Sequence, residues 1–163
     1  MQIIIYKQNT LLCDEFKFKC SVGKKGVSSN KKEGDLKTPK GTYTLGPLFY
    51  RIDRIPKIIT KLKKIPIKKN MGWCNDINSK LYNKLINTKF KVRHEKMFRN
   101  DEKYDLVICI NYNTKKIIKN KGSAIFLHLT KDYKKTQGCI AMKKKDFLIL
   151  LKVIKKRTKI KIL

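Results

Sequence analysis

The chain has 163 residues, 41% hydrophobic and 33% charged, so it is long and apolar enough to fold around its own core without disulfides. Lys and Arg total 41 against 12 acidic residues, a net charge of +29 that would attract any polyanion. Only five of the basic residues are Arg and the Lys residues are scattered, so no specific nucleic-acid binding is predicted. No run of about 18 apolar residues is present, so no membrane span is expected.

The first part of the chain predicts two strands. Residues 2–6 are apolar, and residues 16–22 alternate between apolar and polar side chains, which is typical of a strand with one buried face. A polar loop follows at residues 23–34. The apolar run at the start is shorter than the apolar region of a secretory signal, so no export signal is expected in these residues.

Residues 34–43 have the composition of a turn between strands. Pro39 fixes φ and Gly41 allows a bulge, so this segment is predicted to be a hairpin connection. The basic, isoleucine-rich residues 51–70 are predicted to be irregular, with one short amphipathic helix around residues 58–64.

The middle of the chain offers several polar or aromatic candidates. Trp73, the only tryptophan, follows a glycine in a polar stretch, which suits both a cleft wall and ordinary packing. His94 and Glu95 begin like the zinc-protease pattern H-E-x-x-H, but the second histidine is missing, so the number of ligands is too small for zinc. Arg93 and Arg99 are candidates to bind a substrate carboxylate.

The last third of the chain predicts strands and one helix. Residues 104–112 form a strongly apolar strand, and residues 116–118 a short return strand after a turn. Residues 159–163 alternate as a closing strand. Many short strands with one helix indicate a mainly β, α+β fold. The helix is predicted by apolar residues spaced i, i+3, i+4 and i+7, namely Phe147, Leu150, Leu151 and Ile154.

The five cysteines are odd in number and contain no C-x-x-C pair, so no zinc site is expected and at least one thiol stays free in a monomer. Cys109 lies inside an apolar strand and is predicted to be a core residue. Cys13, Cys20 and Cys74 suit either a core or a partly exposed position. Nothing in the sequence predicts an oligomeric state.

Residues 123–142 hold the strongest candidates for chemistry. His128 lies in an apolar, β-prone run, and after a charged loop Cys139 ends a Thr-Gln-Gly-Cys corner. Two strand ends that share a loop can bring an imidazole and a thiol together, which is the arrangement of an activated nucleophile. The N–H groups of Gly138 and Cys139 are candidates for an oxyanion hole. Singly, such a His and such a Cys are usually structural; together they favour acyl transfer.

The segment from His128 to Cys139 resembles the active-site motif of the YkuD-type L,D-transpeptidase family, in which a histidine precedes Ser/Thr-x-Gly-Cys and the cysteine is the nucleophile. Residues 34–41 look like the family's upstream Gly-Asp-x-x-Thr-Pro-x-Gly signature, and residues 72–105 are similar to the spacer of one branch. The three matches occur in the family's order and cover most of residues 23–151.

The resemblance implies a single catalytic domain over residues 1–163, a mixed β-sandwich with a short helix after the active-site cysteine. It also implies that Cys139 attacks peptidoglycan stem peptides between an L-centre and a terminal D-alanine, with His128 as base or ion-pair partner and no metal or organic cofactor. The activity would serve peptidoglycan biosynthesis, cell-wall organisation and cell shape in a bacterium. The candidate substrate-binding residues are Trp73, Thr136, Gln137 and Arg99.

Two positions depart from the family's pattern: Gln137 stands where the family often has His, and Ala141 cannot bind a substrate carboxylate. An amine acceptor would give a cross-linking transpeptidase, whereas water would give an L,D-carboxypeptidase or another muropeptide hydrolase. A further alternative is a non-catalytic basic binding module in which Cys139 is structural. The family implies a location in the cell envelope or periplasm, and the missing export signal keeps a cytoplasmic location as the alternative.

Overall fold

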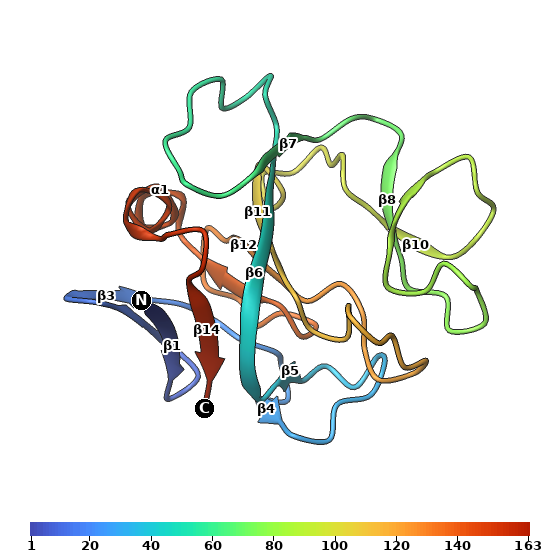
Figure 1. Ribbon diagram of the computed structural model, residues 1–163, viewed down its shortest axis with the longest axis horizontal. Helices are drawn as coiled ribbons and strands as arrows, with labels where there is room; N and C mark the ends of the chain where they lie inside the picture. The colour runs from blue at the N-terminus through green and yellow to red at the C-terminus, as the bar shows by residue number, and fades with distance from the viewer.

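The computed structural model describes residues 1–163 and contains mostly strands, with one short helix (Figure 1). The largest sheet is made of β1 Gln2–Tyr6, β2 Thr10–Cys13, β3 Phe16–Lys19, β6 Gly41–Tyr50, β7 Lys64–Pro66, β11 Leu106–Ile110, β12 Phe126–Leu129, β13 Ile140–Met142 and β14 Lys159–Ile162. Its order is β13-β12-β11-β6-β14-β1-β2-β3, and β7 pairs with β6. The predicted mainly β class is therefore confirmed.

The two ends of this sheet meet. After β3 the chain forms an antiparallel bridge between Ser21 and Ala141 and a parallel bridge between Gly23 and Thr136. The N–H of Ser21 donates to the carbonyl of Ala141 at 2.8 Å, and the N–H of Ala141 donates back at 2.9 Å. The sheet therefore curls into a barrel-like sandwich, and the segment around Cys139 lies in the seam.

Two smaller sheets flank the large one. β4 Val27–Ser28 and β5 Thr38–Pro39 pair in parallel, and β8 Met71–Cys74 pairs with both β9 Leu85–Asn87 and β10 His94–Lys96. In Figure 1 the sheet of β8 and β10 lies on the side of β11 and β6 that faces away from α1, the helix Lys144–Val153. The fold thus has one side built around the helix and another built around β8.

Two groups of buried side chains correspond to these two sides. The main core is a cluster of 27 buried residues that includes Ile3, Leu48, Leu127 and Ile160 and the inner face of α1. As predicted, that face consists of buried Phe147, Leu150 and Leu151, and buried Ile154 follows directly after the helix. The aromatic cluster has nine buried residues: Phe49, Ile67, Trp73, Met97, Tyr104, Val107, Cys109, Ala124 and Phe126.

Three local predictions were wrong. Residues 58–64 form no helix: Ile58 and Leu62 are buried from an irregular loop, because the chain there runs into β7 beside β6. Residues 116–118 form no strand, and the segment around Thr38 is no hairpin connection, since β5 pairs in parallel with β4. The strand β2 was not predicted. No helix of the protein has the length and apolar character needed to cross a membrane.

Candidate active site

The pairing of β12 with β13 brings Cys139 and His128 to one face of the sheet. His128 is the partner of Ala141 in this parallel pair. Side chains two positions apart along a strand share a face, so Cys139, two residues before Ala141, lies on the face of His128. Both residues also contact the aromatic cluster: Cys139 packs against it, and the His128 ring meets Tyr104 edge-on at 5.5 Å between centroids.

His128 is buried as a neutral, oriented imidazole. Its Nδ1 lies 2.9 Å from the carbonyl oxygen of Leu129, and because a carbonyl only accepts, Nδ1 carries the proton. Nε2 is then the unprotonated nitrogen and is free to act as a base. Burial lowers the pKa of His128 from 6.5 to about 4, so the ring is uncharged at neutral pH. A backbone carbonyl thus orients the ring, as Asp or Asn does in many triads.

Cys139 is held as a protonated thiol in the resting protein. Its Sγ lies 3.2 Å from the carbonyl oxygen of Ala124, to which the thiol donates. Burial raises the pKa of Cys139 from 9.0 to about 12, and the nearby carboxyl of Glu95 adds to the rise. Thiol and imidazole are therefore both neutral in the resting protein, an arrangement that suits transfer of the thiol proton to the imidazole.

The corner before Cys139 is fixed by its own hydrogen bonds. The Thr136 hydroxyl donates to the Cys139 carbonyl at 2.6 Å and accepts the N–H of Gly138 at 3.0 Å. Gly138 has φ +143°, and a Cβ there would lie 2.9 Å from the carbonyl oxygen of Lys37, so only glycine fits. The N–H of Gly138 is occupied, whereas that of Cys139 has no acceptor within the chain and remains for an oxyanion.

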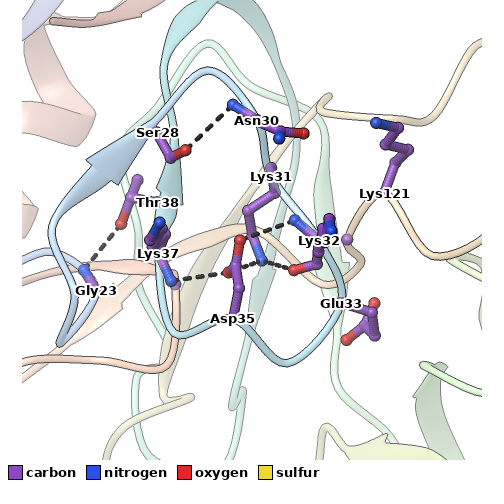
Figure 2. A network of polar contacts seen from close by, with 12 residues as sticks. Gly23, Ser28, Asn30, Lys31, Lys32, Glu33, Asp35, Lys37, Thr38 and Lys121 are labelled. Carbon is purple, nitrogen blue, oxygen red and sulfur yellow. Dashed lines mark hydrogen bonds and ion pairs between the residues drawn. The ribbon is translucent and has the colours of Figure 1, made fainter.

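The upstream Gly-Asp-x-x-Thr-Pro-x-Gly segment supports this corner. The buried Thr38 hydroxyl donates to the Cys139 carbonyl at 3.4 Å and accepts the N–H of Gly23 at 2.9 Å. Figure 2 shows how the loop before Thr38 is held: Asp35 accepts the Lys31 ammonium at 2.6 Å and two backbone N–H groups. This segment therefore positions the corner that carries Cys139.

Trp73 is a packing residue rather than a cleft wall. Its ring is 7% exposed and meets Phe126 edge-on at 5.1 Å, and its Nε1 donates to Asn83 at 2.9 Å. The same Asn83 oxygen accepts the N–H of Ala124 at 3.1 Å, and the Ala124 carbonyl accepts the thiol of Cys139. Asn83 thus supports the site, and no local sequence signal pointed to it, because its partner Ala124 is 41 residues away.

Tyr104 and Glu95 lie beside the pair of Cys139 and His128, and the sequence analysis gave Tyr104 no role in the site. The buried Tyr104 hydroxyl donates to Glu95, and burial raises the pKa of both groups, so Tyr104 stays a phenol. Arg99 is paired with Asp101 at 2.6 and 2.9 Å through two nitrogens. Its guanidinium is therefore committed to a neighbour and is a poor candidate for the predicted role in binding a substrate carboxylate.

Gln137 is exposed and lies at the edge of a polar hollow of about 350 Å³. The other lining residues are Glu33, Gly34, Asn75, Ile77, Arg93 and Asn120. No group of three or more His, Cys, Asp or Glu side chains is arranged to hold a metal ion, and His94 bonds the Val92 carbonyl instead. All five cysteines are thiols, and Cys109 is in the core as predicted.

Comparison with known proteins adds a family and a fold. The sequence profile of the YkuD family, described as the L,D-transpeptidase catalytic domain, matches residues 2–162. Among solved structures, two of Pgp2, a helical cell shape determining protein from Campylobacter jejuni, superpose with TM-scores of 0.55 and 0.53 at 17% and 18% identity. Bd1075 from Bdellovibrio bacteriovorus superposes with a TM-score of 0.50 at 17% identity.

Each superposition covers 99% of this chain but only 46% of the other protein, so the chain spans about half the length of these relatives. At such identity the likeness concerns the fold. No curated protein matches the chain in sequence.

Proposed function

The chain belongs to the YkuD family of L,D-transpeptidase catalytic domains, and we propose that it is a cysteine-dependent acyltransferase acting on peptidoglycan stem peptides. One observation carries the proposal. Cys139 and His128 share a face of the sheet, with Nδ1 of His128 bonded to a carbonyl and Nε2 left as the base. The substrate lies in the cell envelope, and this is where the activity would occur. Pgp2 is described as a cell shape determinant, and an effect on cell shape is part of the proposal.

In the first half-reaction Cys139 Sγ attacks the carbonyl between the L-centre and the terminal D-alanine, and the thiol proton moves to Nε2 of His128. The N–H of Cys139 stabilises the oxyanion of the tetrahedral intermediate. The C–N bond then breaks, His128 returns the proton to the leaving amine, and a thioester remains on Cys139.

In the second half-reaction an acceptor attacks the thioester and restores the thiol. An amine from a second stem peptide gives a cross-link, which is the transpeptidase outcome. Water gives a shortened stem peptide, which is the L,D-carboxypeptidase outcome. Both acceptors lose a proton to His128, so the geometry of Cys139 and His128 serves either product.

The test is product analysis of a stem tetrapeptide ending in D-alanine, with and without an amine acceptor. Wild-type protein should release D-alanine and, with the acceptor, form a cross-linked peptide, whereas Cys139→Ala should do neither. Cys20→Ala, which removes a buried thiol elsewhere, is the control, with folding checked by circular dichroism. Peptide turnover by folded Cys139→Ala, or none by folded wild type, would leave the basic binding module as the better account.

A further inference from the structure

The loop between β6 and β7 and the helix α1 enclose a small groove of about 270 Å³. Three apolar and two basic side chains line this basic groove, namely Lys57, Ile58, Ile59, Leu148 and Lys152. In Figure 1 the loop and α1 lie at the left, whereas the sheet of β8 and β10 lies at the right. The basic groove is therefore well separated from the sheet of β8 and β10, which carries the Trp73 of the aromatic cluster.

Ile59 is the apolar side chain of the groove that is left in water. It is 63% exposed, the highest fraction among the exposed large apolar side chains of the protein. The loop that carries it is anchored, because Ile58 and Leu62 belong to the main core and the Lys64 ammonium donates to the carbonyl of Ile58 at 3.4 Å. The groove thus holds an apolar side chain outward, and its removal from water by a partner is favourable.

The surface around Ile59 carries positive charge without compensation. No acidic residue occurs in residues 54–75 or 147–163, the two segments that supply most of this surface. Neither Lys57 nor Lys152 forms an ion pair. The same two elements carry further exposed lysines: Lys61, Lys63, Lys144 and Lys145. A partner of this surface must therefore be anionic.

The helix turns its basic side toward the groove. Lys144 and Lys152 are each four positions from Leu148, and residues so spaced share one face of a helix. Asp146, the one acidic residue of α1, is two positions from Leu148 and faces elsewhere. The carboxylate of α1 therefore does not neutralise the lysines beside the groove.

The exposed isoleucine and the unpaired lysines together restrict the partner. A soluble polyanion would neutralise the lysines but would leave Ile59 in water. An apolar protein surface would bury Ile59 but would desolvate lysines that have no counterion. A bilayer with anionic lipids offers acyl chains to the isoleucine and phosphate groups to the lysines, whose long side chains extend from the apolar level to the headgroups.

We infer that the basic groove docks this protein on the surface of an anionic lipid bilayer. Ile59 enters the boundary between headgroups and acyl chains, and Lys57 and Lys152 contact lipid phosphates. No segment crosses the membrane in this arrangement. The sheet of β8 and β10 then points toward the aqueous phase, because it lies on the side of the fold away from α1 (Figure 1). This inference goes beyond the proposed function and does not depend on acylation of Cys139.

The test is cosedimentation of the protein with vesicles. Wild-type protein should bind vesicles made of equal parts of phosphatidylglycerol and phosphatidylcholine and should not bind vesicles of phosphatidylcholine alone. Cys139→Ala should bind as wild type does, so this measurement is independent of the acylation test.

Two pairs of variants locate the contact. Ile59→Asn should weaken binding about tenfold, whereas Ile118→Asn, which changes another exposed isoleucine among lysines, should leave it unchanged. Lys57→Gln/Lys152→Gln should weaken binding about 25-fold, since each lysine at an anionic surface contributes about fivefold. Lys89→Gln/Lys91→Gln removes the same charge from an exposed loop between β9 and β10 and should have a much smaller effect.

Tryptophan fluorescence reports whether position 59 enters the bilayer. Trp73, the only native tryptophan, is buried and gives a constant background. Emission of the Ile59→Trp variant should be quenched by vesicles that contain brominated lipids, and emission of Ile118→Trp should not.

Failure of wild-type protein to bind the anionic vesicles would overturn the inference, as would an equal loss of binding in the groove variants and their controls. Loss of binding in Lys57→Gln/Lys152→Gln but not in Ile59→Asn would show a surface for polyanions in general. The lysine pair should then also weaken binding to soluble polyphosphate, and membrane docking through Ile59 would be wrong.

Discussion

The main core and the aromatic cluster are both well buried, but they are built from different side chains and have different roles. The main core is largely Ile and Leu, which pack without direction, and it holds the barrel-like sheet against α1. The rings of the aromatic cluster are fixed by edge-to-face contacts and by polar groups, as in Trp73 and Tyr104. Cys139 and His128 contact the aromatic cluster. Substitutions in the main core should therefore change the stability of the protein without changing the reactivity of Cys139, whereas substitutions in the aromatic cluster should change both.

The largest effect on stability is expected in the main core. Phe147 is completely buried on α1, so Phe147→Ala should lower the free energy of unfolding by about 4 kcal/mol, from lost burial and the cavity left behind. Urea unfolding measures the loss. The acylation rate of Cys139 per folded molecule should stay at the wild-type value, and a slower rate in the folded fraction would show that the two regions are not separable.

Asn83→Ala should lower both the stability of the protein and the acylation rate of Cys139. It leaves the N–H groups of Trp73 and Ala124 without their acceptor, and two unpaired buried donors cost about 3 kcal/mol in all. The Ala124 carbonyl holds the thiol of Cys139, so acylation of the folded fraction should also slow. Asn78→Ala, at an exposed position whose side chain makes no hydrogen bond, is the matched control. Acylation as fast as wild type in Asn83→Ala would refute this link.

The burial of His128 beside the aromatic cluster should make the stability of the protein depend on pH. The folded pKa of about 4 lies below the ordinary value of 6.5, so between these values the unfolded chain binds a proton that the folded chain does not. The free energy of unfolding should therefore decrease as the pH is lowered, by about 2 kcal/mol from pH 7 to pH 5. Urea unfolding at both pH values should show this part of the loss in wild type and not in His128→Asn. An equal loss in both proteins would contradict the burial of a neutral imidazole.

The smallest effect is expected from Tyr104→Phe. It keeps the ring against His128 and removes only the hydroxyl that donates to Glu95, which should cost about 1 kcal/mol. Urea unfolding should detect this loss, and acylation of Cys139 should slow only modestly because the imidazole keeps its aromatic neighbour. Acylation as slow as in Asn83→Ala would mean that the hydroxyl, rather than the ring, matters for the site.

The predictions that succeeded rest on local patterns. The spacing of Phe147, Leu150 and Leu151 defines α1, and the apolar alternation of residues 159–163 gives β14. The same rule failed for Ile58 and Leu62, which have helical spacing but reach the main core from a loop, because pairing of β7 with β6 determines the path of the chain. Local spacing carries no information about such tertiary pairing.

In the candidate site, too, local sequence patterns pointed to some residues, and tertiary contacts determine the others. Cys139 and His128 were proposed from one short stretch, and the structure places them on one face through strand pairing. The contacts of Asn83 with Ala124 and of Tyr104 with His128 join residues 41 and 24 positions apart, so no window along the sequence could reveal them. The sequence left Trp73 open between a cleft wall and packing, because the neighbours that decide its role come from other strands.

The most direct test of the account is intact-mass spectrometry after exposure to a carbapenem, an acyl donor that such cysteines attack. Wild-type protein should gain one adduct, Cys139→Ala none, and His128→Asn the same adduct much more slowly, because Nε2 of His128 removes the thiol proton. The contradicting result is a folded wild-type protein that stays unmodified, or an adduct that persists in Cys139→Ala.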